Sequence, residues 1–402
     1  VLDVVVDLRK DSPTYKMWTS VELTPENGRQ LYVPRGFAHG FVSLKDNTLF
    51  QYLVDSDYKP SHENGFLWND PELNIDWKLE QYGIENPILS EKDKARKTLN
   101  EINPNFYIHK RYLVTGCHGQ LGYDIVRELN KRGIYDILAL DIDDMDITNK
   151  RIVNKIIKEY QPEYIFHCAA YTAVDSAEEN EDLAYKINVI GTKNLAQAAH
   201  DVNAKFIYVS TDYVFDGENN GIYSPEDQTN PKSVYGKTKL MGELEALKNE
   251  KTFIVRTAWV FGINGNNFVK TMLKLSENHE SLTVVNDQVG SPTYTVDLAK
   301  LLVDMSQTEK YGIYHATNEG FISWAEFAEY ILKDTHTKVI PTTTDAYYQP
   351  QYEKAALEGR KLHIANRPKN SRLSKDKLEQ NGFDKLPNWK DAVDRFKNEW
   401  KI

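Results

Sequence analysis

A tyrosine and a lysine four residues apart, Tyr235 and Lys239, have types and spacing that could do chemistry. On a helix, residues i and i+4 share one face, so a phenol and an ammonium there can converge on one substrate atom. A ketone that accepts hydride develops negative charge on its oxygen, and a phenol can supply the proton. A free phenol has a pKa of about 10, and the nearby ammonium is expected to lower it. The pair therefore predicts ketone reduction.

The same pair also occurs on ordinary exposed helices, so its weight depends on a glycine pattern upstream. Gly116-x-x-Gly119-x-x-Gly122 follows a predicted strand and opens a predicted helix. Glycines there permit a tight turn, close approach of backbone N–H groups to a pyrophosphate, and contact between helix and strand. The spacing departs from Gly-x-Gly-x-x-Gly and would by itself also fit a simple tight turn. Together the two patterns predict a nicotinamide dinucleotide site.

A carboxylate supports this prediction. Asp141 ends the second predicted strand 19 residues after Gly122, where it can accept a hydrogen bond from the adenosine ribose 2′-hydroxyl. Such a carboxylate disfavours a 2′-phosphate, so NAD is slightly preferred, although NADPH or NADH both stay open. The expected cofactor-binding residues lie at the ends of the first three strands and on the reactive helix: Gly116, His118, Gly119, Gln120, Leu121, Gly122, Asp141, Asp146, Ile147, Ala169, Ala170, Tyr171 and Lys239.

Two unlike textures divide the chain into predicted domains, 1–107 and 108–402. The first reads as all-β, with strands expected at 1–8, 30–33 and 48–54 between turn clusters. The second alternates strands with helices, which is typical of a Rossmann-type doubly wound parallel sheet. Strands are expected at 112–115, 136–140, 164–168 and 205–210, helices at 119–131, 149–160 and 182–201, and a polar connector at 91–110. Ser323 and Glu326 form a predicted capping box that opens a later helix.

Composition bounds the function classes. The chain has 402 residues, 41% hydrophobic and 27% charged, which suits a globular protein with a sizeable core. A formal net charge of -10 argues against a nucleic-acid partner, and no apolar run approaches the roughly 20 residues that span a bilayer. Only Cys117 and Cys168 occur, which favours a reducing, cytoplasmic location. The chain opens inside a predicted strand without Met, so sequence is expected to precede Val1.

Residues 111–402 resemble the extended short-chain dehydrogenase/reductases, and more narrowly the dTDP-4-dehydrorhamnose reductases. The resemblance rests on the stretches 115–122, 169–175, 210–217, 235–239, 256–262, 286–293 and 367–373. It implies a smaller C-terminal substrate-binding subdomain, a homodimer, and a dTDP-4-keto-6-deoxyhexose substrate whose ketone meets Tyr235 and Thr211, with Lys239 on the nicotinamide ribose. Tyr213 stands where related dehydratases have a glutamate, which favours reduction over elimination. Magnesium use and the hexose stay open.

The resemblance also assigns substrate-binding residues: Thr172, Val174, Trp259, Asn286, Gln288 and Arg367. Simpler readings compete for two of them, because Trp259 could be a core aromatic and Arg367 could form a surface salt bridge. No metal-ligating set is expected.

The stretches 3–9, 12–14, 34–41, 58–60 and 68–71 carry a second resemblance. Through them, residues 1–93 resemble the C-terminal part of dTDP-4-dehydrorhamnose 3,5-epimerase, which has a cupin-type jelly roll. The resemblance implies that Tyr52 is the acid, that Asp93 orients a basic histidine, and that His39 is a different pocket histidine. The basic histidine is expected before Val1, so this half is expected to be an incomplete jelly roll without epimerase activity. As metal ligands the half offers only His39 and His62, and both also fit ordinary core or surface positions.

Two other functions stay open. The regulatory subunit of methionine adenosyltransferase resembles the same reductases and would bind a dinucleotide without catalysis. The fused epimerase-like half argues against that reading, since a regulator has no use for it. The third reading is a ketoreductase for another nucleotide-sugar.

Overall fold

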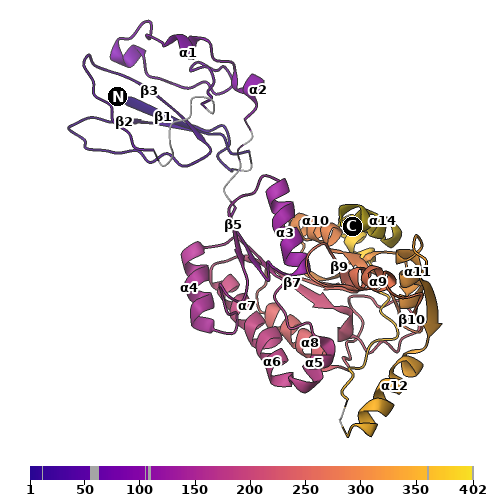
Figure 1. The fold of residues 1–402 in the computed structure, drawn as a ribbon. Helices are drawn as coiled ribbons and strands as arrows, with labels where there is room; N and C mark the ends of the chain where they lie inside the picture. The colour runs from indigo at the N-terminus through magenta and orange to yellow at the C-terminus, as the bar shows by residue number, and fades with distance from the viewer. Residues whose placement is uncertain (11, 55–62, 105, 107–109, 360–361, 401–402) are drawn as a thin grey trace. The chain divides into compact units, whose positions relative to one another are not determined.

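Figure 1 shows the computed structural model of the chain, which describes residues 1–10, 12–54, 63–104, 106, 110–359 and 362–400. The chain divides into two units, Val1–His109 and Lys110–Ile402. The boundary predicted at 107/108 falls among residues that the structure does not describe. Each unit is considered by itself below.

The first unit is built on a three-stranded antiparallel sheet. Its central strand β1 (Leu2–Asp7) pairs with β2 (Trp18–Glu22) and β3 (Phe37–Val42) on its two sides. Every residue of β1 is buried, and Val6 packs with Leu73 and Leu99 in a small core. The predicted strand at 1–8 is therefore confirmed, and alternation places Leu2, Val4 and Val6 on one face and Asp3, Val5 and Asp7 on the other.

Two sequence-based expectations for this unit are wrong. Residues 30–33 and 48–54 form no strand, because no neighbouring chain segment within the described residues pairs with them, and Leu49, Tyr52 and Leu53 are exposed. The polar connector at 91–110 contains two short helices, α1 (Glu91–Lys94) and α2 (Leu99–Ile102), and the short helix η2 (Glu80–Tyr82) precedes it. Ser90 caps α1, and a Thr98–Glu101 capping box starts α2.

The second unit contains a six-stranded, all-parallel sheet, which confirms the predicted Rossmann-type architecture. The strand order is β13-β8-β7-β6-β4-β5. The strands span β4 (Tyr112–Thr115), β5 (Ile137–Leu140), β6 (Tyr164–His167), β7 (Lys205–Thr211), β8 (Thr252–Thr257) and β13 (Gly312–His315). The chain runs from β4 out to β5 and then returns to β6 on the other side of β4, which makes a topological switch point where ligands bind.

Helices cover both faces of this sheet (Figure 1). Alternation along β4 directs Tyr112 and Val114 toward one face and Leu113 toward the other. The first face packs against α3 (Gln120–Lys131) and α10 (Thr295–Ser306), and the second against α4 (Lys150–Tyr160) and α7 (Thr192–Asp201). The sheet is thus packed between two apolar layers, one on each face.

The predicted helix at 182–201 is interrupted in the structure. It consists of α6 (Glu181–Tyr185), the π-helical turn η3 (Lys186–Gly191) and α7. The wider turn directs buried Asn188 inward, where its side chain accepts from the Tyr171 N–H (2.8 Å) and donates to Thr238 Oγ1 (3.1 Å). This contact is formed across the fold, so the local sequence pattern did not reveal it.

The unit also has helices between and after the strands of the sheet along the chain. They are α5 (Val174–Glu179), α8 (Val234–Ala246), α9 (Phe268–Ser276), α11 (Trp324–Ile331), α12 (Thr344–Leu357), α13 (Asp376–Gln380) and α14 (Trp389–Glu399). Short strand pairs join them: β9 (Val260–Phe261) with β12 (Thr293–Tyr294), β10 (Ser281–Val285) with β16 (Lys338–Thr342), β11 (Val289–Gly290) with β15 (Ile322–Ser323), and β14 (Asn318–Glu319) with β17 (Leu386–Asn388). The predicted Ser323–Glu326 capping box is present at the start of α11.

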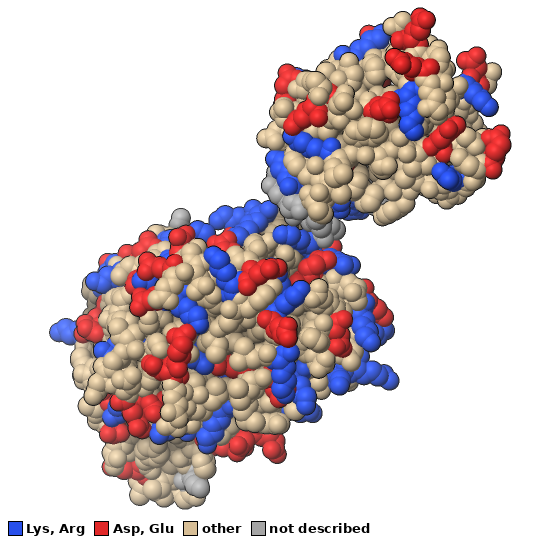
Figure 2. All heavy atoms as spheres, turned by 180° about the vertical axis from the view of Figure 1, so that it is seen from behind, with Lys and Arg blue, Asp and Glu red and all other residues tan. Residues whose placement is uncertain are grey.

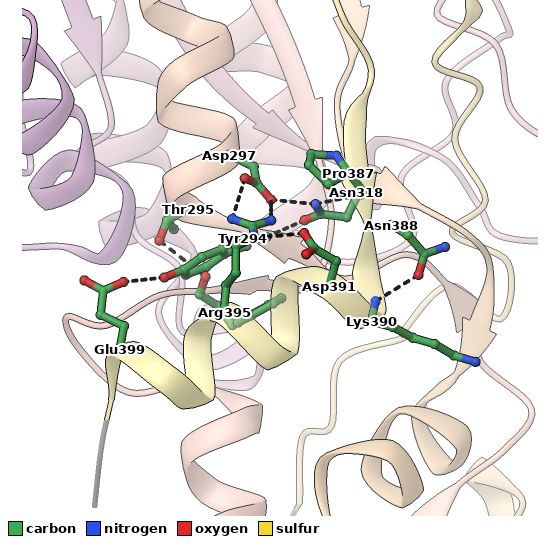
Figure 3. A network of polar contacts seen from close by, with 11 residues as sticks. Tyr294, Thr295, Asp297, Asn318, Pro387, Asn388, Lys390, Asp391, Arg395 and Glu399 are labelled. Carbon is green, nitrogen blue, oxygen red and sulfur yellow. Dashed lines mark hydrogen bonds and ion pairs between the residues drawn. The ribbon is translucent and has the colours of Figure 1, made fainter.

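The last helix is bound tightly to the rest of the unit. Figure 3 shows Arg395 of α14 donating to both oxygens of Asp297 on α10 (2.9 and 2.7 Å). Glu399 accepts from the Tyr294 hydroxyl, and Phe396 packs against Phe261 in a separate aromatic core. The C-terminal elements are therefore fixed to the dinucleotide-type sheet rather than loosely attached.

The face shown in Figure 2 carries basic and acidic side chains in mixture over the larger unit. That face presents no continuous basic stripe in the described residues, and the absence of a nucleic-acid partner stays a prediction. Among the helices that the structure describes, none is long and apolar enough to cross a membrane.

Candidate active site

A cavity of about 790 Å³ opens at the carboxyl ends of β4, β6 and β7. It collects three groups of residues that lie far apart in the sequence. They are the glycine turn after β4, the ends of β5 and β6, and the start of α8. This is the position expected for a dinucleotide at a switch point.

The glycine turn has the close packing that the pattern predicted. Gly116 has a φ of +67°, and a Cβ added to Gly122 would lie 2.2 Å from the Gly116 carbonyl oxygen. Side chains at these positions would collide with backbone, so the turn can exist only with glycine. The N-terminus of α3 follows directly, and its free N–H groups are suited to a pyrophosphate.

Asp141 directly follows β5 and lies beside the glycine turn. Its carboxylate accepts hydrogen bonds from the backbone N–H groups of His118 (3.0 Å) and Ile142 (2.8 Å). These bonds fix the carboxylate at the rim of the cavity. Together with Cys117, the side chains of His118 and Asp141 also form a cluster with the composition of a metal site, but His118 is exposed and the cluster coincides with the dinucleotide turn.

Of the predicted cofactor residues, all but Tyr171 line this cavity: Gly116, His118, Gly119, Gln120, Leu121, Gly122, Asp141, Asp146, Ile147, Ala169, Ala170 and Lys239. Tyr171 lies next to them along the chain, and its backbone is bound by Asn188. The structure thus brings the predicted cofactor residues together, and their roles stay predictions.

The three proposed reactive side chains line the same cavity. Thr211 ends β7, while Tyr235 and Lys239 lie one turn apart on α8, whose N-terminus Ser233 caps by accepting from the Gly236 N–H (3.1 Å). Lys239 is buried, with 3% of its surface exposed. One face of α8 therefore places the phenol of Tyr235 and the ammonium of Lys239 in the wall of the large cavity.

The electrostatics differ from the sequence-based expectation. Burial raises the pKa of Tyr235 to about 12, against the lowering effect of a hydrogen bond with Thr211. Burial also lowers the pKa of Lys239 to about 7. The expected lowering of the phenol pKa by Lys239 is not found, since burial is the largest effect on the phenol. The Lys239 ammonium itself donates to the Val209 carbonyl (2.7 Å). At neutral pH the phenol is protonated and able to donate.

A smaller cavity of about 240 Å³ adjoins the large one. Both are lined by Asp212, Tyr213, Trp259 and Trp324. Trp259 has a φ of +48°, which is strained for a bulky residue and is typical of functional positions, and its ring stacks on Trp324 at 3.8 Å. Trp259 is therefore a wall between the cavities and not a fully buried core aromatic.

The other predicted substrate residues divide into three cases. Thr172 and Val174 line the large cavity, and Gln288 and Arg367 line the small one. Asn286 lines neither; it is exposed, and its backbone N–H donates to the Thr342 carbonyl (2.8 Å).

Arg367 forms an ion pair at the edge of the small cavity. Its guanidinium donates to both oxygens of Asp175 on α5 (2.9 and 2.7 Å), and it lies 5.7 Å from the centre of the Tyr348 ring. Burial is the largest single effect and opposes the charge, but the bond to Asp175 and the charge interactions with Tyr213, Tyr348 and Asp175 together raise the pKa of Arg367 above its usual range. The side chain is thus a fixed cation at the edge of the small cavity.

Sequence reasoning missed most residues of the small cavity, among them Asp212 and Tyr348. Asp212 is buried, and its carboxylate accepts from the hydroxyls of Ser371 (2.5 Å) and Thr211 (3.0 Å). Burial raises the pKa of Asp212 to about 6. Tyr348 of α12 also lines this cavity. The position of Asp212 directly after a strand-end threonine was a usable signal, whereas nothing in the local pattern marked Tyr348.

The predicted residues of the first unit are only partly brought together. His39 Nε2 contacts Asp3 Oδ1 (2.5 Å), and the Phe50 ring lies near both His39 (6.4 Å) and Tyr52 (5.9 Å). Asp93 accepts from the Ser90 hydroxyl (2.6 Å) at the start of α1. His62 and the predicted 58–60 stretch lie outside the described residues.

Comparison with known proteins fits this geometry. Residues 110–402 match the family model "RmlD substrate binding domain". The dTDP-4-dehydrorhamnose reductase of Aggregatibacter actinomycetemcomitans is 42% identical over 284 residues, which cover 67% of this chain and 92% of that protein.

The chain belongs to the dTDP-4-dehydrorhamnose reductase family.

Solved structures agree with this assignment. The crystal structure of the Bacillus anthracis reductase in complex with NADP superimposes with a TM-score of 0.67 at 41% identity, covering 73% of this chain and all of that one. A Clostridium acetobutylicum reductase gives a TM-score of 0.67 at 43% identity, with the same coverage. Residues 1–101 match a second family model, dTDP-4-dehydrorhamnose 3,5-epimerase. Both predicted resemblances, and the oxidoreductase class, are thereby confirmed.

Proposed function

We propose that residues 110–402 reduce the 4-keto group of dTDP-4-dehydro-L-rhamnose to give dTDP-L-rhamnose, with NADPH or NADH as the reductant. One observation carries the proposal: the phenol of Tyr235 lies in the same cavity as the glycine turn, with Thr211 and Lys239 beside it. A reduced nicotinamide bound there would supply the hydride.

The chain's own residues then manage the proton and the charge. Tyr235 donates its proton to the ketone oxygen as negative charge develops there. The Thr211 hydroxyl, which donates to Asp212 in this structure (3.0 Å), turns to donate a second hydrogen bond to that oxygen. Lys239, when charged, stabilises the phenolate that remains. Since Tyr213 occupies the position of a second acid, the site lacks the carboxylate that an elimination would use there. Arg367 and Gln288 are proposed to hold the nucleotide in the small cavity.

The first test is turnover itself. Purified protein, incubated with dTDP-4-dehydro-L-rhamnose, is expected to consume the absorbance of NADH or NADPH stoichiometrically with product. Calorimetric titration with each cofactor serves as the control for folding of the site. Tight dinucleotide binding without turnover would favour the regulatory reading, and turnover only with other 4-keto sugars would favour a different ketoreductase.

We further propose that Asp141 sets the choice of cofactor, with a slight preference for NADH. Replacing Asp141 by Ala should raise the ratio of kcat/KM for NADPH over NADH by about tenfold, because one repulsion of about 1.4 kcal/mol against a 2′-phosphate is removed. Asp201, at the end of α7, lines neither cavity and gives the matched control Asp201→Ala. An unchanged ratio in Asp141→Ala would assign cofactor choice elsewhere.

For the remaining parts, we propose a cupin-type fold for residues 1–101, with His39 and Tyr52 facing an epimerase-type pocket. The match to the epimerase model and their shared neighbour Phe50 support this placement. A homodimer is proposed from the family resemblance and is checked by light scattering.

A further inference from the structure

The face of α8 that carries Tyr235 and Lys239 continues one turn further to a third ionisable residue, Glu243. Residues four apart on a helix lie above one another, so the three side chains form one row. Glu243 is 1% exposed. A carboxylate so deeply buried is costly unless other groups compensate for its lost hydration.

The compensation comes from the two strands under α8. Arg256 of β8 donates from Nε to one carboxylate oxygen (2.9 Å) and from Nη2 to the other (2.7 Å), and both partners are almost fully buried. The Ser210 hydroxyl of β7 donates a third bond (2.5 Å). Ser210 immediately precedes Thr211, so the row is attached to the strand that carries a reactive residue. Glu243 is therefore held in one orientation.

Lys239 itself has only neutral direct contacts. Its ammonium donates to the Val209 carbonyl (2.7 Å) and lies 4.1 Å from the centre of the Tyr208 ring. No carboxylate within the described residues forms an ion pair with it. A buried ammonium in such surroundings tends to lose its proton, because burial disfavours the charged form.

Several titratable groups face Lys239. His167 ends β6 and Cys168 follows it, Tyr208 lies on β7, and Tyr235 and Glu243 lie on α8. Burial lowers the pKa of His167 to about 3 and raises that of Cys168 to about 12, so both are neutral at neutral pH. Burial likewise keeps the two phenols protonated. Among these groups, Glu243 is the one that brings a negative charge to Lys239.

We propose that Glu243 is a positioning residue of the reductase, whose carboxylate, clamped by Arg256 and Ser210, opposes the loss of the proton from the Lys239 ammonium beside the Tyr235 phenol. The inference rests on the proposed reduction, which requires a charged Lys239. It adds to that reaction a buried charge that touches neither substrate nor cofactor.

The decisive variant is Glu243→Gln, which keeps the shape and removes the charge. Lys239 should then lose its proton at a lower pH, and the unpaired Arg256 acts in the same direction. The alkaline limb of the kcat/KM profile should move down by about 1 pH unit, the lower end of the effect of one nearby charge. Affinity for the dinucleotide below that limb should change little.

A second readout does not depend on turnover. The titration of Lys239 can be followed by NMR in protein carrying ¹³C at the lysine ε-carbon, with Lys239→Arg to assign the signal. The Lys239 pKa should fall in Glu243→Gln by the same amount as the kinetic limb. If the wild-type protein proves inactive, the proposed function fails while this titration still tests the role of Glu243.

The matched control is the ion pair in Figure 3. Asp297 is held by Arg395 with the same bidentate geometry (2.9 and 2.7 Å), yet neither residue lines the large or the small cavity. Asp297→Asn should lower thermal stability without moving either pH readout. If Glu243→Gln does not fold, the double variant E243Q/R256M replaces the buried pair by neutral groups and should still show a downward shift. An unshifted Lys239 titration, or an equal shift in Asp297→Asn, overturns the proposal.

Discussion

Tyr235→Phe is expected to lower kcat by about 10²–10⁴-fold, the usual contribution of a positioned proton donor. The hydroxyl is removed while the ring and its packing stay, so the Kd for NADH or NADPH should change by less than about threefold, roughly 0.6 kcal/mol. Steady-state kinetics and calorimetric titration measure the two quantities on the same preparation. The expected result is a loss confined to turnover.

A second phenol provides the control for this experiment. Tyr213 lies edge-on to Tyr235, with ring centres 5.3 Å apart, and lines both cavities. Tyr213→Phe should reduce kcat by no more than about tenfold, since it removes one hydrogen-bonding group and no essential proton. If Tyr235→Phe stays active while Tyr213→Phe does not, the proton donor is Tyr213.

Gly122→Ala should weaken dinucleotide binding by at least about tenfold, or 1.4 kcal/mol. The added methyl would lie 2.2 Å from the Gly116 carbonyl oxygen and 2.8 Å from its carbon, both in backbone that cannot turn aside. The turn must therefore open, and opening displaces the N–H groups at the start of α3 from the pyrophosphate position. Fluorescence titration with the dinucleotide measures the loss.

Gly133 separates this local effect from general instability. Its φ is +76° and no atom lies within 4 Å of an added Cβ. Gly133→Ala should cost about 1–2 kcal/mol of folding stability through backbone strain alone, with dinucleotide affinity unchanged. A similar drop in Tm for both variants, with weakened binding only in Gly122→Ala, is the expected pattern. Equal affinities would show that the turn tolerates the extra methyl.

Local patterns predicted the parts of the fold that local physics determines. The alternation of strands and helices after residue 111 and the glycines at 116, 119 and 122 act over short distances, and both were identified correctly. Four strands of the sheet, β4 to β7, were predicted from the alternation, whereas β8 and β13 were not. The meeting of Tyr235, Lys239 and Thr211 was expected from the family resemblance. For the alternation and the glycine turn the sequence sufficed, because each depends on neighbours along the chain.

Features that depend on distant partners were not predicted. Arg367 pairs with Asp175 across 192 residues, and the pKa of Tyr235 depends on burial by the whole fold. The predicted strand at 48–54 has β-type residues, but a strand also needs a hydrogen-bonding neighbour, which propensity does not supply. The π-helical turn likewise arises from contacts of Asn188 with other segments.

The attachment of α14 also has a consequence for how the chain is made. Arg127 of α3 pairs with Glu399, 272 positions later, so α3 gains this partner only after α14 has been made. Until α14 emerges from the ribosome, the aromatic side chains of Phe261 and Tyr294 lack their cover, Phe396. Nascent chains would expose this patch from the synthesis of Tyr294 until that of Phe396, which makes them clients for chaperones.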